Sequence, residues 1–303
     1  MKKPGLDRVY LFAALHTIIT GLSFLFGKTA LRFASPIDVL AFRFTASFIA
    51  LMVPVLLKKI SINFKERNLL KIFVLGLLYP IAFFGFQTFG LAYATSSEAG
   101  ILQSITPIFV MILSAVLLKE KSTLCQKASM LLSVLGVIYI FIMKGSSVDF
   151  TEVLGITLLL LSSLSSAGYT VLNRITLRDF SIIEISFMMT LLGFLVFNAT
   201  ALATHFWQGT LNQFFAPLQS FEFIISILYL GILSSLVTSL LNSFVLSKIE
   251  AAKMSVFGNL RTVVAIFAGV FFLKEQLYYY HIIGSLMIIA GVIGTNYTMN
   301  TSN

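Results

Sequence analysis

Long apolar runs alternate with short polar breaks along the whole chain. Each run holds about 20 residues, which is the length that an α-helix needs to cross the hydrocarbon core of a bilayer. Residues within a run do not alternate between polar and apolar, so the strands of a membrane barrel are excluded. The pattern predicts ten membrane-spanning helices, over residues 9–30, 39–57, 69–93, 99–118, 125–143, 153–173, 182–204, 223–246, 252–273 and 279–297.

Two of these runs end in the same tripeptide. Leu-Lys-Glu stands at 118–120 and again at 273–275, which is 155 positions later. At the same offset, the Gly-Val-Ile triplet at 136–138 falls on a second Gly-Val-Ile at 291–293. Single leucine matches carry little weight in such a sequence, but two triplets in one register indicate an internal duplication.

The remaining parts of the chain follow the same duplication. Gln87 falls on Asn242 at the offset of 155, and in the front halves Lys28 falls on Arg174 at an offset of 146. The two offsets differ by nine residues, which a longer linker around 205–220 in the second copy accounts for. We therefore expect two copies of one five-helix unit.

The expected copies span residues 9–143 and 153–297. Because five is an odd number of helices, the second copy enters the membrane in the opposite orientation. Inverted-topology repeats are a recurrent architecture of secondary transporters, with the substrate site between the repeats near the midplane of the membrane. Some channels also use inverted repeats, so this symmetry favours a transporter without excluding a channel.

The composition indicates whether water or lipid surrounds this protein. Hydrophobic residues make up 58% of the chain, charged residues make up 11%, and the mean hydropathy is +0.96. Soluble domains are about 45–50% apolar and about 25% charged. The charged residues are too few to cover a water-facing surface, so we expect an all-α integral membrane protein in a lipid bilayer. The single cysteine, Cys125, excludes an intramolecular disulfide.

Lysine and arginine predict the orientation in the membrane. With the N-terminus inside, 15 of these residues fall in inside segments and four fall outside. This bias predicts that both termini are cytoplasmic and that the protein is a multi-pass protein of the plasma membrane. It also explains the net charge of +9 without a nucleic-acid partner. The run at 9–30 is too long for a signal peptide, so we interpret it as a retained first helix.

Each copy carries the same marks on its last two helices. The fourth helix ends at Glu120 in the first copy and at Glu275 in the second, and the final helices carry Gly-Val pairs at 136–137 and 291–292. Together with ten helices in two copies, these features resemble the EamA family of the drug/metabolite transporter superfamily. The resemblance covers residues 10–297. It implies the fold and a transport function, but members are linked with export of amino acids, other metabolites and drugs.

The opening helices add to the resemblance. Residues 20–24 (Thr-Gly-Leu-Ser-Phe) are similar to the first-helix motif of the family, in which a tryptophan stands at the position of Thr20. Residues 38–43 are similar to its second-helix pattern, in which an arginine, here Arg43, follows a short apolar stretch. The second copy has Met189 at the corresponding position.

No catalytic or metal-binding pattern competes with this interpretation. The chain lacks the Walker A motif, so it is not expected to use ATP itself, and it lacks a Gly-x-Ser-x-Gly elbow. The three histidines, at 16, 205 and 281, lie in separate segments, without the spacing of a metal site. We expect no enzyme activity, no cofactor and no metal.

Polar residues inside the predicted helices are the candidates for a substrate site, because charge at membrane depth is expensive and usually faces a cavity or a partner. Arg261 lies near the middle of its helix, where it could hold an anionic group of the substrate or form a structural ion pair with Glu98. Arg43 lies close to a helix end, so it could also extend to the outer interface.

Three neutral residues complete the candidate substrate site. Gln87 and Asn242 are mid-helix and related by the repeat, so they either line the cavity or form interhelical hydrogen bonds. His16 lies in the first helix, either packed or at the edge of the cavity. Glu98 is a candidate coupling carboxylate, although a carboxylate at the start of a helix commonly caps its N-terminus. Glu120 and Glu275 are expected to have structural roles at helix ends.

These observations predict a secondary transporter that works by alternating access. It would export a small organic metabolite such as an amino acid or a related compound, and it could form a homodimer. Drug or cation efflux and translocation of nucleotide sugars or lipid-linked compounds are alternatives within the class. A passive channel is the alternative from another class.

Overall fold

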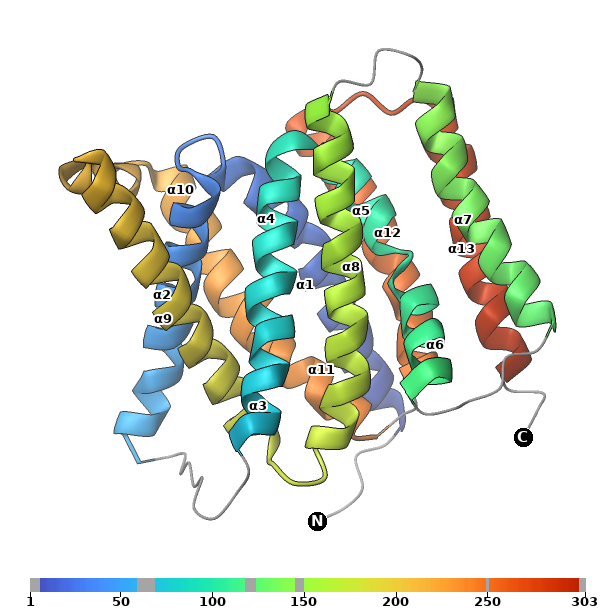
Figure 1. Ribbon diagram of the computed structural model, residues 1–303, viewed down its shortest axis with the longest axis horizontal. Coiled ribbons are helices and arrows are strands. Elements are labelled where there is room, and N and C mark those ends of the chain that lie inside the picture. The colour runs from blue at the N-terminus through green and yellow to red at the C-terminus, as the bar shows by residue number, and fades with distance from the viewer. Residues whose placement is uncertain (1–5, 59–68, 118–123, 145–149, 249–250, 300–303) are drawn as a thin grey trace.

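The computed structural model describes residues 6–58, 69–117, 124–144, 150–248 and 251–299, and every regular element in them is helical (Figure 1). The elements of the first copy are α1 (Leu6–Ala30), α2 (Pro36–Leu56), α3 (Leu69–Gly76), η1 (Leu77–Ala82), α4 (Phe83–Tyr93), α5 (Ser96–Gln103), α6 (Thr106–Leu117) and α7 (Leu124–Lys144).

The second copy repeats this order. Its elements are α8 (Phe150–Thr176), α9 (Ile182–Gln208), the short helices η2 (Leu211–Gln213) and η3 (Ala216–Gln219), α10 (Phe221–Leu228), η4 (Tyr229–Val237), α11 (Thr238–Leu246), α12 (Ala251–Leu273) and α13 (Tyr279–Met299). The segments η1 and η4 are π-helical. Each lies in the middle of the third long helical rod of its copy, which consists of α3, η1 and α4 in the first copy and of α10, η4 and α11 in the second.

The described helices confirm an all-helical protein of the membrane-spanning kind. Seven helical spans are long and apolar enough to cross a bilayer: 8–30, 36–56, 70–93, 96–117, 150–176, 182–208 and 221–246. Shorter apolar helices in the described residues cover 127–140, 261–273 and 279–291. The ends of the predicted run at 69–93 coincide with the ends of the α3–η1–α4 rod.

Prolines stand at two interruptions of the described helices. Tyr79 leaves the helical region directly before Pro80, with φ −147° and ψ 113°. The span at 96–117 breaks at Ser104 and Ile105, and Pro107 follows as the second residue of α6. Pro54, by contrast, lies inside α2, which continues past it. A proline lacks an N–H group and clashes with the preceding turn, which explains why the helix fails near it.

The two copies run in opposite directions. In Figure 1, α1 and α7 ascend from the lower to the upper edge of the picture, whereas α8 and α13 descend. We use "upper side" for the edge where α1 ends and α2 begins, and "lower side" for the edge where α11 ends and α12 begins. Because α1 starts at the lower side and α8 starts at the upper side, the second copy is inverted relative to the first.

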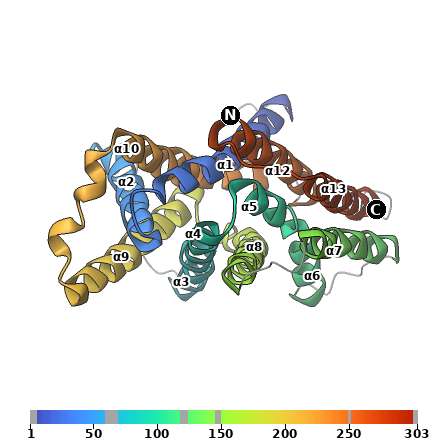
Figure 2. The same cartoon turned by 90° about the horizontal axis from the view of Figure 1, so that it is seen from above.

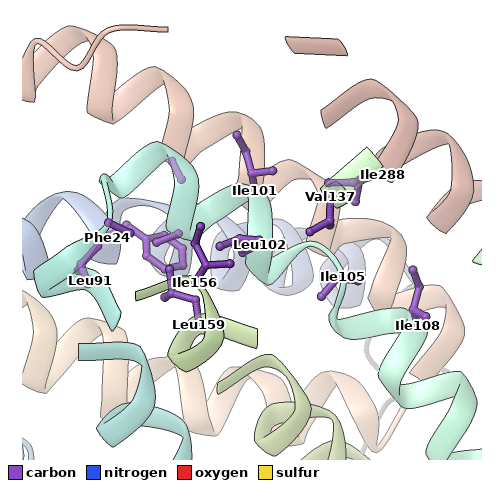
Figure 3. Close-up of a cluster of buried hydrophobic side chains, with 13 residues drawn as sticks. Phe24, Leu91, Ile101, Leu102, Ile105, Ile108, Val137, Ile156, Leu159 and Ile288 are labelled. Atoms are coloured by element: carbon purple, nitrogen blue, oxygen red, sulfur yellow. The ribbon is translucent and has the colours of Figure 1, made fainter. Parts of the chain in front are cut away.

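One buried apolar cluster joins the two copies. It includes Phe24 of α1, Leu102 of α5, Leu159 of α8, Ala265 of α12 and Ile288 of α13. Figure 3 shows Phe24, Leu102, Leu159 and Ile288 of this cluster on different helices. Lipid is as apolar as these side chains, so the cluster stabilises the fold through close packing rather than through removal of apolar surface from water.

Glycines bring α7 and α13 close together at one edge of the bundle (Figure 2). A methyl group added at Gly136 would lie 2.8 Å from the carbonyl oxygen of Gly284 and 3.0 Å from side-chain carbons of Met287 and Ile288. The Ser133 hydroxyl also donates a hydrogen bond to the Ile288 carbonyl at 3.0 Å. The final helices of the two copies therefore pack against each other almost backbone to backbone.

We predict that Gly136→Ala lowers stability, because the added methyl group forces α7 and α13 apart. The expected loss is about 1–3 kcal/mol, as for other overpacked sites. Thermal unfolding in detergent measures it. The matched control is Gly85→Ala in α4, where the added methyl group meets no atom within 4 Å. Equal melting temperatures for the two variants would contradict the close approach of α7 and α13.

Candidate functional site

A central cavity lies between the two copies. The first copy contributes α1, η1, α4, α5 and α6 to its walls, and the second copy contributes α8, η4, α11 and α12. Helices from both repeats therefore form one concave site in the middle of the bundle.

The cavity is lined by corresponding positions of the two copies. Four pairs from the third rod of each copy, all related by the offset of 155, face it: Tyr79 with Ser234, Phe83 with Thr238, Phe84 with Ser239, and Gln87 with Asn242. Thr106 and Arg261 form a further pair at this offset. Corresponding positions of the two copies therefore line the same cavity, but their side chains differ in type.

One part of the cavity wall is aromatic and another part carries hydroxyl groups. Tyr79 is the centre of the aromatic wall, with ring centroids 5.1 Å from Phe83, 4.9 Å from Phe84 and 4.5 Å from Tyr169 of α8. The corresponding side chains of the second copy are short and polar. An apolar, planar part of a ligand can pack on the first wall while its polar groups bond to the second.

Four of the five predicted substrate-site residues line this cavity. They are His16, Gln87, Asn242 and Arg261, and they come from α1, α4, α11 and α12. They lie far apart in the chain, and inverted repeats bring them together. Their roles in substrate binding stay predictions, since position alone does not establish function.

Arg43 lies one layer behind the cavity wall. Its Nε donates a hydrogen bond to the Ser235 hydroxyl at 2.8 Å, and its Nη2 donates one to the Ser234 hydroxyl at 3.1 Å. The guanidinium carbon is 3.9 Å from the centroid of the Phe84 ring. The side chain is only 3% exposed. It therefore joins α2 to η4 inside the protein instead of extending to the membrane interface.

Glu98 caps the N-terminus of α5. Its Oε2 accepts hydrogen bonds from the Thr95 amide at 2.9 Å and the Thr95 hydroxyl at 3.1 Å, and the Thr95 hydroxyl accepts one from the Glu98 amide. Its Oε1 lies 3.8 Å from Nε2 of His281. This geometry is that of a capping box, which satisfies amide groups that have no partner within the helix. Glu98 lies at the upper side and is not among the residues lining the cavity.

Glu275 connects the two copies at the upper side. Its Oε1 accepts a hydrogen bond from the Ser96 amide at 2.7 Å, and its Oε2 accepts hydrogen bonds from the Ser97 amide at 3.0 Å and the Ser97 hydroxyl at 2.6 Å. A carboxylate at the first amides of α5 also meets the positive end of the helix dipole. Glu120, its counterpart in the first copy, lies outside the described residues.

Further contacts close the upper side above the cavity. The Lys28 ammonium donates hydrogen bonds to the carbonyls of Leu91 at 2.9 Å and Ala94 at 2.7 Å, which end α4. At the level of the cavity, a methyl group added at Gly21 of α1 would lie 2.7 Å from Val264 of α12. The Thr262 hydroxyl of α12 donates to a carbonyl of α5 at 3.1 Å. These helices leave no room for a side chain between them.

On the lower side the cavity extends further. Its lining continues along α11 to Leu246, the last residue of that helix, and along α6 to Val110. The cavity is therefore closed by helix packing at the upper side and reaches toward the lower side.

Four buried polar atoms of the lining have no hydrogen-bond partner within the described part of the chain. They are Nδ1 of His16, Oε1 of Gln103, Oη of Tyr169 and Nε of Arg261. The amide nitrogen of Gln103 donates to the Ser162 hydroxyl at 2.9 Å, so only its oxygen is unsatisfied. Buried polar groups are normally hydrogen-bonded, so unpaired ones around one cavity suit a site that a polar ligand fills.

Helices of membrane-spanning length around a central polar cavity define a multi-pass membrane protein of the transporter type. The model of the EamA-like transporter family matches residues 7–142 and again 153–297. The chain therefore belongs to this family, and the resemblance seen in its motifs is confirmed. It carries two copies of the family's domain.

Relatives agree with this assignment. The chain is 46% identical to the "uncharacterized transporter YcxC" of Bacillus subtilis (strain 168), over 98% of this chain and 95% of the relative. It is 30% identical to an "uncharacterized transporter" of Archaeoglobus fulgidus, over 93% and 96%. One solved crystal structure shares the fold, with a TM-score of 0.66 and 14% identity over 98% of this chain and 99% of that one.

Sequence reasoning did not identify the contact between Glu275 and α5. The repetition of the Leu-Lys-Glu tripeptide indicated that this carboxylate has a specific structural role. The tripeptide does not reveal the partner, because Ser96 and Ser97 belong to the other copy and become neighbours only after folding.

We predict that Glu275→Gln weakens the closure of the upper side, because a neutral amide replaces a carboxylate that holds two amides and a hydroxyl. Hydrogen bonds to a charged group contribute about 1.5–3 kcal/mol. The change in closure is measured by thiol labelling of a Ser23→Cys variant in a Cys125→Ser background, because residue 23 lines the cavity. Its labelling from the upper side by a membrane-impermeant thiol reagent should become roughly ten- to hundredfold faster.

The control for this prediction is Glu222→Gln. Glu222 is an exposed carboxylate on the same side of the protein, in the first turn of α10, and its substitution should leave labelling unchanged. A labelling rate in Glu275→Gln equal to that of the control would show that the carboxylate does not hold the upper side closed.

Proposed function

We propose that this protein is a secondary transporter that exports small organic metabolites, such as amino acids or related compounds, by alternating access. The observation that carries the proposal is the central cavity, which corresponding positions of two inverted copies line and which is closed at one side. In an inverted repeat, an exchange of conformations between the copies converts closure at one side into closure at the other. The substrate would occupy the cavity during this exchange.

We propose further that the lower side faces the cytoplasm of a cell bounded by a plasma membrane. Ten spans with both termini at the lower side place 15 lysines and arginines inside and four outside. In this orientation the cavity of the described state receives a substrate from the cytoplasm, which suits an exporter. The upper contacts of Glu275 and Lys28 then form the outer closure.

The energy source in this proposal is an ion gradient or the gradient of the solute itself, since the sequence has no nucleotide-binding motif. Glu98 is the candidate coupling carboxylate. Its approach to His281, at 3.8 Å, places a second titratable group beside it at the outer closure.

The test begins with a ligand for the purified protein. A thermal-shift screen with amino acids, nucleotides, sugars and cationic drugs identifies one, because a ligand that binds only the folded state at 100 times its Kd stabilises it by about 2.7 kcal/mol. Counterflow of that labelled ligand in proteoliposomes then separates the mechanisms. A transporter exchanges labelled for unlabelled ligand across the membrane, whereas a channel only dissipates the gradient.

We predict that a disulfide across the outer closure stops this exchange. A Cβ added at Gly269 would lie 2.5 Å from the Ser97 hydroxyl, so cysteines at these two positions are close enough to be oxidised. In the Cys125→Ser background, oxidised Ser97→Cys/Gly269→Cys protein should lose counterflow, and a reductant should restore it. Each single-cysteine variant is the control. Unchanged counterflow in the cross-linked protein would rule out alternating access through movement at this contact.

A further inference from the structure

The cavity carries positive charge that no carboxylate of its described lining neutralises. Arg261 lines it, and its Nε has no partner among the described residues. A second guanidinium, that of Arg43, lies directly behind Phe84 and Ser234, both of which face the cavity, and its hydrogen bonds are to neutral hydroxyl groups. One buried and one partly buried cation without an anion are unfavourable unless a ligand supplies the negative charge.

Several acidic residues elsewhere in the described structure are bound to other partners. Asp38 accepts from the Ser35 hydroxyl at 2.7 Å and lies 3.0 Å from Nε2 of His205. Asp179 pairs with Lys71 at 2.6 Å, and Glu184 accepts from the Ser181 amide at 2.8 Å. These contacts, like those of Glu98 and Glu275, lie at helix ends. The guanidinium of Arg261 therefore faces a cavity whose described lining is otherwise uncharged.

The neighbours of Arg261 supply groups that suit an anion. His16 lines the cavity from α1, which packs against α12, and its Nδ1 has no partner in the described structure. A guanidinium offers planar N–H groups that match the two oxygens of a carboxylate. An imidazole N–H can bind one of these oxygens as well. The arrangement resembles the binding site of a carboxylate more than that of an amine.

An ammonium group would find a poorer environment. The described lining offers it neutral acceptors, among them Oε1 of Gln103, and places it within the same low-dielectric cavity as Arg261. Like charges repel strongly where water is scarce. A cation is therefore disfavoured, and a zwitterion gains from the arginine at its carboxylate while losing at its ammonium group.

The aromatic wall defines the rest of the ligand. Tyr79, Phe83, Phe84 and Tyr169 form a packed set of rings beside the cavity. Planar apolar groups gain offset-stacked and edge-to-face contacts with such rings. The cavity thus combines one unpaired cation with an apolar surface for a planar group.

We propose that the cavity selects organic monoanions that carry a planar ring and no amino group, in preference to zwitterions and cations. This proposal rests on the proposed function, since it names the substrate class of the same cavity. Among small organic metabolites, it names aromatic carboxylates as the preferred substrates, ahead of amino acids. Arg261 is the residue that determines the preferred charge.

Three compounds with one phenylethyl body test the proposal, because they differ mainly in charge. They are 3-phenylpropionate, phenylalanine and phenethylamine, and binding of each to the purified protein is measured by thermal shift and calorimetry. We expect 3-phenylpropionate to bind at least tenfold more tightly than phenylalanine, and phenethylamine to show no saturable binding. Equal or tighter binding of phenylalanine or phenethylamine would overturn the proposal, as would failure of all three to bind.

Variants of Arg261 connect the preference to this side chain. Arg261→Gln should remove the preference for the anion, whereas Arg261→Lys, which keeps the charge, should retain it at reduced affinity. Arg32→Gln is the control, because Arg32 is an exposed cation at the upper side. If Arg261→Gln fails to fold, loss of the preference in Arg261→Lys decides against the proposal. An unchanged preference in folded Arg261→Gln does so as well.

Counterflow of 3-phenylpropionate separates this proposal from the proposed function. Tight binding without exchange across the membrane would leave the ligand class intact and would overturn the transport mechanism. Exchange of cations or amino acids, with weak binding of 3-phenylpropionate, would leave the transport mechanism intact and would overturn the ligand class.

Discussion

A carboxylate of the second copy holds the amide end of a helix of the first. The bonds from Ser96 and Ser97 to Glu275 satisfy N–H groups that have no partner within α5. Ser96 and Ser97 are buried inside the protein, so their amide groups need partners within it. The closure at the upper side, the position of α5 and the upper limit of the cavity all depend on this contact.

The cavity shows how a duplicated unit acquires a binding site. Corresponding positions still face the same space, as Gln87 and Asn242 do, but the side chains have diverged into an aromatic wall and a hydroxyl wall. Symmetry provides two similar halves that can exchange conformations, and divergence provides a ligand with distinct surroundings on its two sides. A cavity with identical walls would offer less discrimination among ligands.

Much of the fold was predictable because membrane helices are recognised by length and hydropathy. The run at 69–93 has the observed ends of its rod, and the duplication pointed to Gln87 and Asn242. Arg261 and His16 were identifiable because polar groups at membrane depth are energetically costly and usually face a cavity or a partner. These predictions required only local sequence or the repeat itself.

Other features depend on contacts between distant segments. The sequence placed Arg43 near a helix end, but its hydrogen bonds to Ser235 and Ser234 depend on where η4 lies. The π-helical turns of η1 and η4 have no distinctive residue pattern apart from Pro80. The cap that Glu275 provides joins residues from the two copies, and only the packed structure reveals it.

The pairing of α7 with α13 has a mechanical consequence. These are the final helices of the two inverted copies, and they contact each other at one edge of the bundle through Gly136 and Gly284. In the proposed alternating-access mechanism the two copies exchange conformations. Each of these helices would then take the place of the other, so their mutual contact would be the same before and after. The α7–α13 pair can therefore keep its position while the remaining helices rotate around it.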